Sequence, residues 1–203
     1  MSQITKSSLM TNRPVAASQA TTIEQSRAIA QVQGALVVAK QSPRDEIAAR
    51  ARVEAACQNQ YLAEHAFFRF TRGGQQVSGP SVHLAREIAR CWGNIDYGIA
   101  ELARDDATGS SEMMAWAWDL ETNARVVNTF ISPHRRDTRQ GAVDLTDMRD
   151  IYENNANAGA RRLRECIFAV LPKSLVEEAK TLCLRTLEQG GGVPIEEIGR
   201  AHV

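Results

Sequence analysis

The chain has 203 residues, of which 43% are hydrophobic, and this length suffices for one substantial core. Its 24 Lys and Arg residues balance its 24 Asp and Glu residues, which excludes a polycation of the histone type, so any nucleic-acid binding must depend on local separation of charge. Neither a signal peptide nor an apolar run long enough to span a bilayer is present, and the four cysteines form no Cys-x-x-Cys pair. These features predict a cytoplasmic protein with reduced thiols and no membrane partner.

Two helices are predicted after an irregular N-terminal segment. Residues 1–20 are rich in Ser, Thr, Gln and Ala without a period, which is typical of a disordered leader. Thr21 and Glu24 form a capping box that opens the first helix, and Pro43 marks the first turn of the second, which is expected to continue toward Tyr61. The apolar residues expected to face inward are Ile23, Ile29, Val32, Leu36, Ile47, Ala51 and Ala55.

A β-hairpin follows, because the aromatic, β-prone run 67–72 and the run 75–78 flank the pair Gly73-Gly74. Arg69 and Arg72 lie on the first of these strands, near the predicted tip. Residues 79–81 then begin a helix that ends at Gly93-Asn94.

Three strands with turn signals between them are predicted at residues 95–104, 111–120 and 125–132. On the middle strand, Trp116 and Trp118 share one face with Met114 and Leu120. We interpret that face as the core under a helix, which leaves the small face of Ala115 and Ala117 free; the alternative is that the two tryptophans stack on bases. The fold class expected from this order is α+β, in which a β-hairpin and an antiparallel β-meander pack with a long basic helix and N-terminal helices.

A basic loop at 133–143 contains Arg135, Arg136 and Arg139, and a long helix capped by Asp144 with Asp147 follows it. From Asn154 to Pro172 this helix separates an apolar row from a polar one. The expected buried row is Tyr152, Ala156, Gly159 (or Ala160), Leu163, Ile167 and Val170. The polar row is Asp150, Asn154, Asn157, Arg161 and Arg164, with Arg162 on its flank. We interpret the polar row as the wall of a nucleic-acid groove.

A last helix is predicted at 174–189, so that residues 21–189 form a single domain with its core at 67–171 and a tail at 190–203. The last six residues, 198–203, back-translate as ATC GGA AGA GCA CAC GTC, which resembles the beginning of a common sequencing adapter. We therefore expect the natural chain to be longer and this end to be an assembly artefact.

Two other patterns suggest chemistry, and both have simpler interpretations. Residues 74–81 nearly match a P-loop, but Pro80 stands where a lysine must reach the phosphates, so we favour a plain turn and helix cap over a helix start that holds one backbone phosphate. Asp144, Asp147, Asp150 and Glu153 recur every three residues, which suggests a metal-dependent nuclease, although acids near a helix start also favour its dipole without further purpose. The histidines are scattered and no nucleophile motif is present, so no catalytic residue and no metal site is predicted.

The order of these elements resembles the core of single-strand annealing proteins, the group that holds the eukaryotic Rad-family annealer and the phage Sak, RecT and Red-beta types. Residues 76–87, continuing to Trp92-Gly93-Asn94, are similar to the family's strand, glycine, helix and Gly-Asn turn. Residues 159–164, Gly-Ala-Arg-Arg-Leu-Arg, are similar to the Gly-Leu-Lys-Arg-Ala-Leu-Arg motif on its DNA-binding helix. The resemblance covers about residues 67–171, and Ser81 departs from it, because the family often has a basic residue there.

The resemblance implies that Arg161 and Arg162 grip the backbone of single-stranded DNA from the inner wall of a groove. It also implies an ATP-independent, cofactor-free annealing protein of phage recombination, which forms homo-oligomeric rings or filaments in the bacterial cytoplasm. A phage exonuclease or a host single-strand binding protein would be its partners. The arginines expected to line the DNA groove, together with Asn157, are Arg69, Arg72, Arg135, Arg136, Arg139, Arg161, Arg162 and Arg164.

Two other functions stay open at this point. A metal-dependent phage nuclease would use Asp144, Asp147 and Asp150. A structural or assembly protein would leave all of the basic groups solvated and would not bind nucleic acid.

Overall fold

The computed structural model describes residues 19–72, 75–138 and 141–190. The chain divides into two compact units, Met1–Val38 and Ala39–Val203. The first holds most of helix α1 (Gln19–Gln41), so the predicted leader lies outside the described residues except for its last two, which begin α1. The expected inward face of this helix is wrong, since Ile23 and Ile29 are 60% and 59% exposed. Apolar residues occur on all sides of α1, so it has no single stripe to bury.

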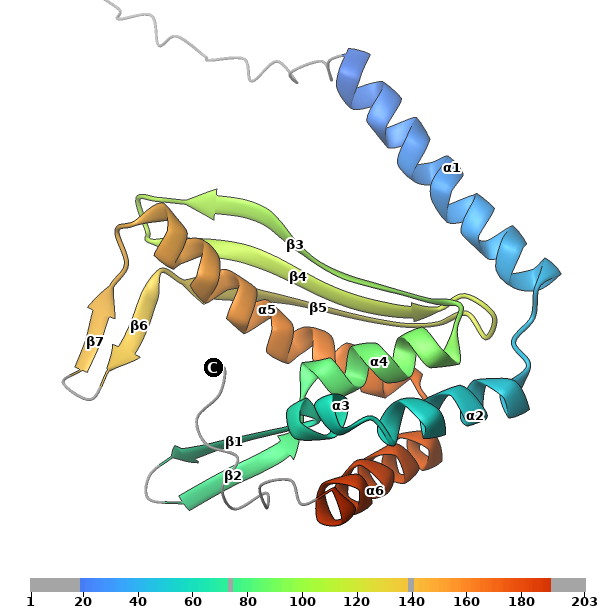
Figure 1. Cartoon of the computed structure of the whole chain (residues 1–203). Coiled ribbons are helices and arrows are strands. Elements are labelled where there is room, and N and C mark those ends of the chain that lie inside the picture. Colours follow the sequence, from blue (N-terminus) through green and yellow to red (C-terminus); the bar gives the residue numbers. More distant parts are fainter. Residues whose placement is uncertain (1–18, 73–74, 139–140, 191–203) are drawn as a thin grey trace, which may run out of the picture. The chain divides into compact units, whose positions relative to one another are not determined.

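Helices and antiparallel sheets build the second unit, which confirms the α+β fold class (Figure 1). Its strands are β1 (Phe67–Arg72), β2 (Gln75–Pro80), β3 (Ile95–Asp105), β4 (Ser110–Asp119), β5 (Ala124–Pro133), β6 (Arg135–Thr138) and β7 (Gly141–Asp144). β1 pairs with β2, β3–β4–β5 form a meander, and β6 pairs with β7. The predicted hairpin and meander are present, and the predicted basic loop is instead the β6–β7 hairpin.

The helices of this unit are α2 (Glu46–Cys57), α3 (Gln60–His65), α4 (Val82–Trp92), α5 (Met148–Val170) and α6 (Lys173–Gln189). Asp45 caps α2 by accepting hydrogen bonds from the backbone N–H groups of Ile47 and Ala48 (3.0 and 3.1 Å), so Pro43 lies before the helix and not in its first turn. α2 ends at Cys57, and Asn59 caps the short α3, which is a separate helix and not a continuation. Ile47 is 83% exposed, because the buried face of α2 is that of Ala49, Val53 and Cys57.

Helix α5 runs along one face of the β3–β5 sheet (Figure 1) and packs mainly on the central strand β4. The face that it covers carries Ala115 and Ala117, which are fully buried, whereas Trp116 and Trp118 lie on the other face and are half-buried. The prediction for the two faces is therefore wrong. Trp116 lies across Gly98 of β3 and donates a hydrogen bond to Asp96 (2.8 Å). Small residues form the covered face because the helix must approach the strands closely.

The start of the second unit is fixed to the sheet by a buried arginine. Arg44 donates to both carboxylate oxygens of Asp119 (3.1 and 3.2 Å) and to the carbonyl of Trp92 (2.9 Å). The side chains of Arg44 and Asp119 are only 5% and 3% exposed. The guanidinium also lies 4.6 Å from the ring centroid of Trp92. A buried charge needs this complete set of partners, because an unpaired charge in the interior is strongly unfavourable.

Candidate nucleic-acid interface

Helix α5 begins at a side-chain cap. Asp147 is the N-cap residue, and its carboxylate accepts hydrogen bonds from the backbone N–H groups of Arg149 (2.8 Å) and Asp150 (3.4 Å). The prediction that Asp144 caps this helix is wrong, because Asp144 ends β7, where it pairs with Arg135 at 3.5 Å. The cap stabilises the first turn, since helix N-termini leave backbone donors unsatisfied.

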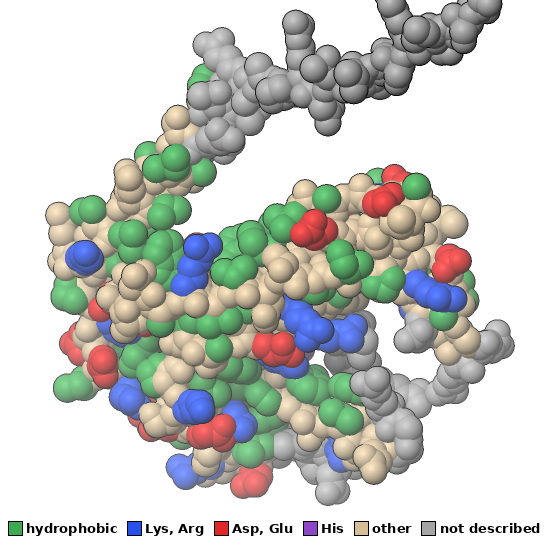
Figure 2. Space-filling view, turned by 180° about the vertical axis from the view of Figure 1, so that it is seen from behind, with side chains coloured by type: hydrophobic (Ala, Val, Ile, Leu, Met, Phe, Trp, Pro, Cys, Tyr) green, Lys and Arg blue, Asp and Glu red, His purple; other side chains and the backbone are tan. Residues whose placement is uncertain are grey.

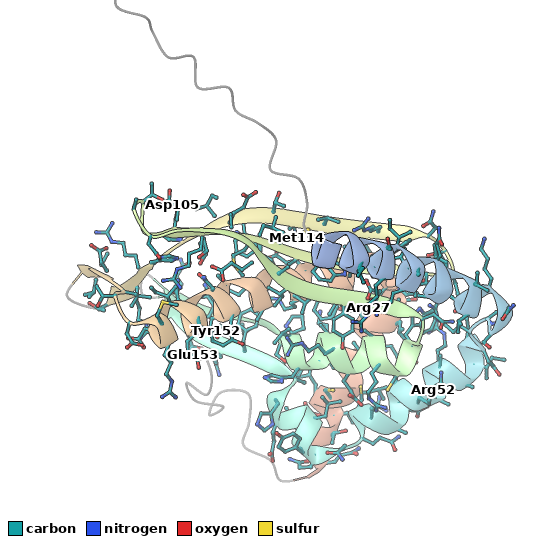
Figure 3. All side chains as sticks on the ribbon, turned by 90° about the horizontal axis from the view of Figure 1, so that it is seen from above. Arg27, Arg52, Asp105, Met114, Tyr152 and Glu153 are labelled. Atoms are coloured by element: carbon teal, nitrogen blue, oxygen red, sulfur yellow. The ribbon has the colours of Figure 1, made fainter. Side chains whose placement is uncertain are left out.

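The buried row of α5 differs from the prediction in the first two turns. Ile151 and Asn155 are buried there, and Tyr152 is 70% exposed. Tyr152 and Glu153 lie on the part of α5 near the β3–β4 turn, which Asp105 marks (Figure 3). From Gly159 onward the predicted row holds, with Leu163, Ile167 and Val170 buried.

A cavity of about 380 Å³ lies between α5, the end of β5 and the start of β6. It is referred to below as the α5 groove. Two segments form it, residues 130–135 across the junction of β5 and β6 and residues 154–165 of α5, and they bring polar and basic side chains together with apolar groups of β5. The lining residues are Phe130, Ile131, Ser132, Pro133, Arg135, Asn154, Ala158, Arg161, Arg162, Arg164 and Glu165.

Positive charge predominates in the α5 groove, since Glu165 is the one acidic side chain among its lining residues. Arg161 is exposed and has no hydrogen bond or ion pair with the part of the chain that the structure describes. Arg162 is 49% exposed, pairs with Glu165 at 3.4 Å, and lies 5.8 Å from the ring centroid of Phe130. Such exposed ion pairs are weak, so a phosphate group can replace the carboxylate at little cost. Lys and Arg side chains gather near the middle of the face seen in Figure 2, with an acidic side chain beside them.

Arg164 connects the helix to the β1–β2 hairpin. Its guanidinium lies 4.6 Å from the ring centroid of Phe68 and donates to the carbonyl of Pro80 (3.5 Å). Only 20% of its side chain is exposed, and burial lowers the pKa of this guanidinium from its ordinary value, an effect that Glu165 opposes and Arg161 reinforces. Arg164 therefore has a structural role beside its place in the groove, and it is less available to a ligand than Arg161.

A buried polar cluster positions Arg135. The hydroxyl of Ser111 donates to Glu101 (2.6 Å) and accepts from the amide of Asn155 (2.9 Å), while Nε2 of His134 lies 2.8 Å away. Because a hydroxyl has one proton, Nε2 of His134 must carry a hydrogen and donate. These bonds fix the segment in which Pro133 and Arg135 flank His134 and line the groove. Ser111 is fully buried, so its hydroxyl holds the structure together and is not placed to attack a substrate.

Sequence reasoning missed this cluster. Asn155 and His134 are polar residues at buried positions, 4% exposed each, and nothing in their spacing distinguishes them from solvated groups. A second contact supports the same segment, because Asn154 donates to the carbonyl of Pro133 (2.9 Å).

Comparisons with models of protein families, with curated proteins and with solved structures find no match for this chain. Among the described residues, no helix is both long and apolar enough to cross a membrane.

Not all of the arginines predicted for the groove lie in it. Arg135, Arg161, Arg162 and Arg164 do, whereas Arg136 and Asn157 are exposed outside its lining. Arg69 is half-buried on β1, where it donates to the side chain of Gln76. Arg72 belongs to β1, but its side chain lies outside the described part of the chain, as does the whole of Arg139.

The two remaining sequence patterns have local structural roles. Ser81 caps α4 by accepting from the N–H of Leu84 (3.2 Å) and donates to the carbonyl of His65 (2.6 Å), which agrees with the favoured interpretation of residues 74–81 as a turn and cap. Asp147 is engaged as the cap of α5, and Asp150 and Glu153 are exposed. In the described ranges, no group of three or more His, Cys, Asp or Glu side chains is arranged to hold a metal ion.

Proposed function

We propose that this protein binds single-stranded DNA along the α5 groove and anneals complementary strands without ATP. The observation that carries the proposal is the unpaired Arg161 beside the weakly paired Arg162, on a helix fixed by the sheet beneath it. Arg135 of β6 also lines the groove, and its ion pair with Asp144 (3.5 Å) is exposed and therefore weak. Guanidinium groups with free donors suit phosphate oxygens, since their planar forks match that geometry.

The chemistry expected of such a groove is sequence-tolerant. Contacts to the sugar-phosphate chain position a strand without reading its bases, and Phe130 offers an aromatic surface within the same lining. Base edges held away from the protein can test pairing with a second strand. The pairing energy then comes from the DNA, about 1.4 kcal/mol for each stacked step, and no catalytic residue is required.

The test compares Arg161→Ala plus Arg162→Ala with wild type in binding and annealing. A matched control, Lys173→Ala plus Arg185→Ala, removes the same charge from exposed positions of α6. If each groove contact contributes about 1 kcal/mol, as for exposed ion pairs, the groove variant binds a poly-dT oligonucleotide about 30-fold more weakly. Fluorescence anisotropy measures this affinity, and ATP-free annealing of two labelled oligonucleotides measures the activity.

The salt dependence gives a second readout. For single strands, the slope of log K against log salt falls by about 0.7 for each lost phosphate contact, so the groove variant is expected to lose about 1.4 in slope and the control nothing. Equal affinity and equal annealing in wild type and groove variant would refute the site. Absence of any poly-dT binding at low salt would favour a structural protein. Magnesium-dependent cleavage that Asp150→Asn abolishes would favour a nuclease.

A further inference from the structure

A second and larger cavity lies away from the α5 groove. Its volume is about 720 Å³, which is in the range of small-molecule sites, and it opens between α2, α3, α4 and the start of β3. It shares no lining residue with the α5 groove, and it is referred to below as the α2–α4 pocket. The side chains that give it its chemistry are Arg52, Tyr61, His65, His83, Arg86, Glu87 and Arg90.

Cationic groups exceed acidic ones in this lining. Arg90 donates to Glu87 (2.9 Å), and this hydrogen bond is the main reason that the pKa of Glu87 lies below its ordinary value. Glu87, the one acidic group among the lining residues, is therefore ionised and neutralised by Arg90. Arg52 and Arg86 remain as excess positive charge.

Both of these arginines offer free donors. Nε of Arg52 donates to the carbonyl of Cys91 (3.1 Å), which holds the guanidinium in place while its two terminal nitrogens have no partner among the described residues. Arg52 projects from α2 (Figure 3), and Arg86 projects from α4 with no hydrogen bond or ion pair to the described part of the chain. Two oriented or unpaired guanidinium groups in one pocket suit a phosphate group.

An aromatic surface lies in the same pocket. Tyr61 is 72% exposed, and its ring centroid is 4.3 Å from that of His65. Nδ1 of His65 lies 2.7 Å from the carbonyl of Tyr61, which fixes the imidazole against the tyrosine ring. The ring of His83 meets that of His65 edge-on, with centroids 6.2 Å apart. An exposed, supported tyrosine ring is a surface on which a base can stack.

We propose that the α2–α4 pocket binds a nucleoside phosphate, with its phosphate on Arg52 and Arg86 and its base on Tyr61. The ligand is a free nucleotide or the phosphorylated 5′ end of a DNA strand, which share this chemistry. The inference goes beyond the proposed function, because annealing along the α5 groove requires neither of them.

The first test measures binding of thymidine monophosphate by isothermal titration calorimetry, with thymidine as the probe that lacks phosphate. Wild type is expected to bind the monophosphate and not thymidine. The pocket variant, Arg52→Ala plus Arg86→Ala, is expected to bind the monophosphate at least tenfold more weakly. The control variant, Lys173→Ala plus Arg185→Ala, keeps wild-type affinity. Tyr61→Ala, a change at an exposed position, is expected to weaken binding of the monophosphate, whose base stacks on the ring, but not binding of inorganic pyrophosphate, which has no base.

The second test distinguishes the two sources of ligand. If the pocket holds a strand end, wild type binds a 5′-phosphorylated dT oligonucleotide more tightly than its 5′-hydroxyl form, and the pocket variant loses this difference. Equal affinity for both oligonucleotides, with monophosphate binding intact, assigns the pocket to the free nucleotide. The proposal is overturned if wild type neither binds the monophosphate nor prefers the 5′-phosphorylated oligonucleotide. It is also overturned if the pocket variant binds these ligands as tightly as wild type does. The groove variant keeps its monophosphate binding, so failure here is distinct from failure of the annealing proposal.

Discussion

Gly159 sets how closely α5 approaches the sheet, and replacing it with alanine gives the sharpest test of the packing. A Cβ atom at this position would lie 2.7 Å from Cγ2 and 3.1 Å from Cδ1 of Ile99 on β3. The side chain of Ile99 is branched at Cβ and stiff, so its Cγ2 atom cannot swing away. Helix and strand must therefore separate by several tenths of an ångström.

Two effects of opposite sign decide the magnitude. Alanine favours a helix over glycine by about 1 kcal/mol, whereas forcing an extra methyl group into a packed contact costs about 1–3 kcal/mol. The difference between the two effects is a net loss of about 0–2 kcal/mol, and we expect the upper half of this range because the collision at 159 involves a buried helix position and a branched side chain at 2.7 Å. Gly159→Ala should then lower the free energy of unfolding by about 1–2 kcal/mol, which for a chain of this size is a decrease in Tm of about 5 °C.

Urea unfolding followed by circular dichroism at 222 nm measures the change, and Gly34→Ala is the matched control. Gly34 also lies inside a helix, α1, but nothing lies within 4 Å of its Cβ position, so alanine is expected to raise helicity there at no cost. A second variant isolates the contact: in Ile99→Ala plus Gly159→Ala the collision is removed, so the double variant should be at least 1 kcal/mol more stable than the sum of the single effects. Gly159→Ala protein as stable as wild type, or additive effects in the double variant, would refute the reasoning.

Three further predictions concern the rest of the second unit. Arg44→Met leaves the buried carboxylate of Asp119 without its partner and should lower the free energy of unfolding in urea by about 3–5 kcal/mol. Arg50→Ala breaks an exposed ion pair with Glu178 (3.1 Å) and should lower it by less than about 1 kcal/mol, so equal losses would contradict the burial argument. Trp116→Phe should change the poly-dT affinity measured by fluorescence anisotropy by less than about twofold, because Trp116 lies on the sheet face opposite α5. A large loss of affinity would instead place the DNA site on the tryptophan face. Burial raises the pKa of the Cys166 thiol above its ordinary value of 9.0, so the unfolded chain loses this proton at a lower pH than the folded chain does. The free energy of unfolding should therefore fall as pH rises above about 9, and it should fall less steeply in Cys166→Ala. A urea-unfolding free energy that stays constant from pH 8 to pH 10 would count against this prediction.

Alternation along the strands allowed the sheet to be predicted but not its orientation. A period of two separates the tryptophan face from the alanine face of β4, and the same pattern fits either face under a helix. Hydrophobicity favours burying Trp116 and Trp118. The structure instead covers Ala115 and Ala117, since a helix that touches β3 through a glycine leaves no room for indole rings.

Much the same limit applies to the candidate groove. The helical period placed Arg161, Arg162 and Arg164 together on α5, because a period of 3.6 is a local property of the chain. That Arg135 of β6 joins them depends on Asn155, Ser111 and an inward-facing His134, which meet only through tertiary contacts. Polar residues at buried positions contradict the pattern on which sequence reasoning depends, so the first two turns of α5 were predicted in the wrong phase.

The same buried cluster has a consequence for how this protein can vary. The hydroxyl of Ser111 is the shared hydrogen-bond partner of Glu101, His134 and Asn155. Loss of the Ser111 hydroxyl therefore removes this hydrogen-bond partner from both His134 and Asn155 in the interior, whereas replacing a whole set with apolar groups of matching shape can be nearly neutral. Related chains are therefore expected to show covariation at positions 111, 134 and 155, with all three polar or all three apolar.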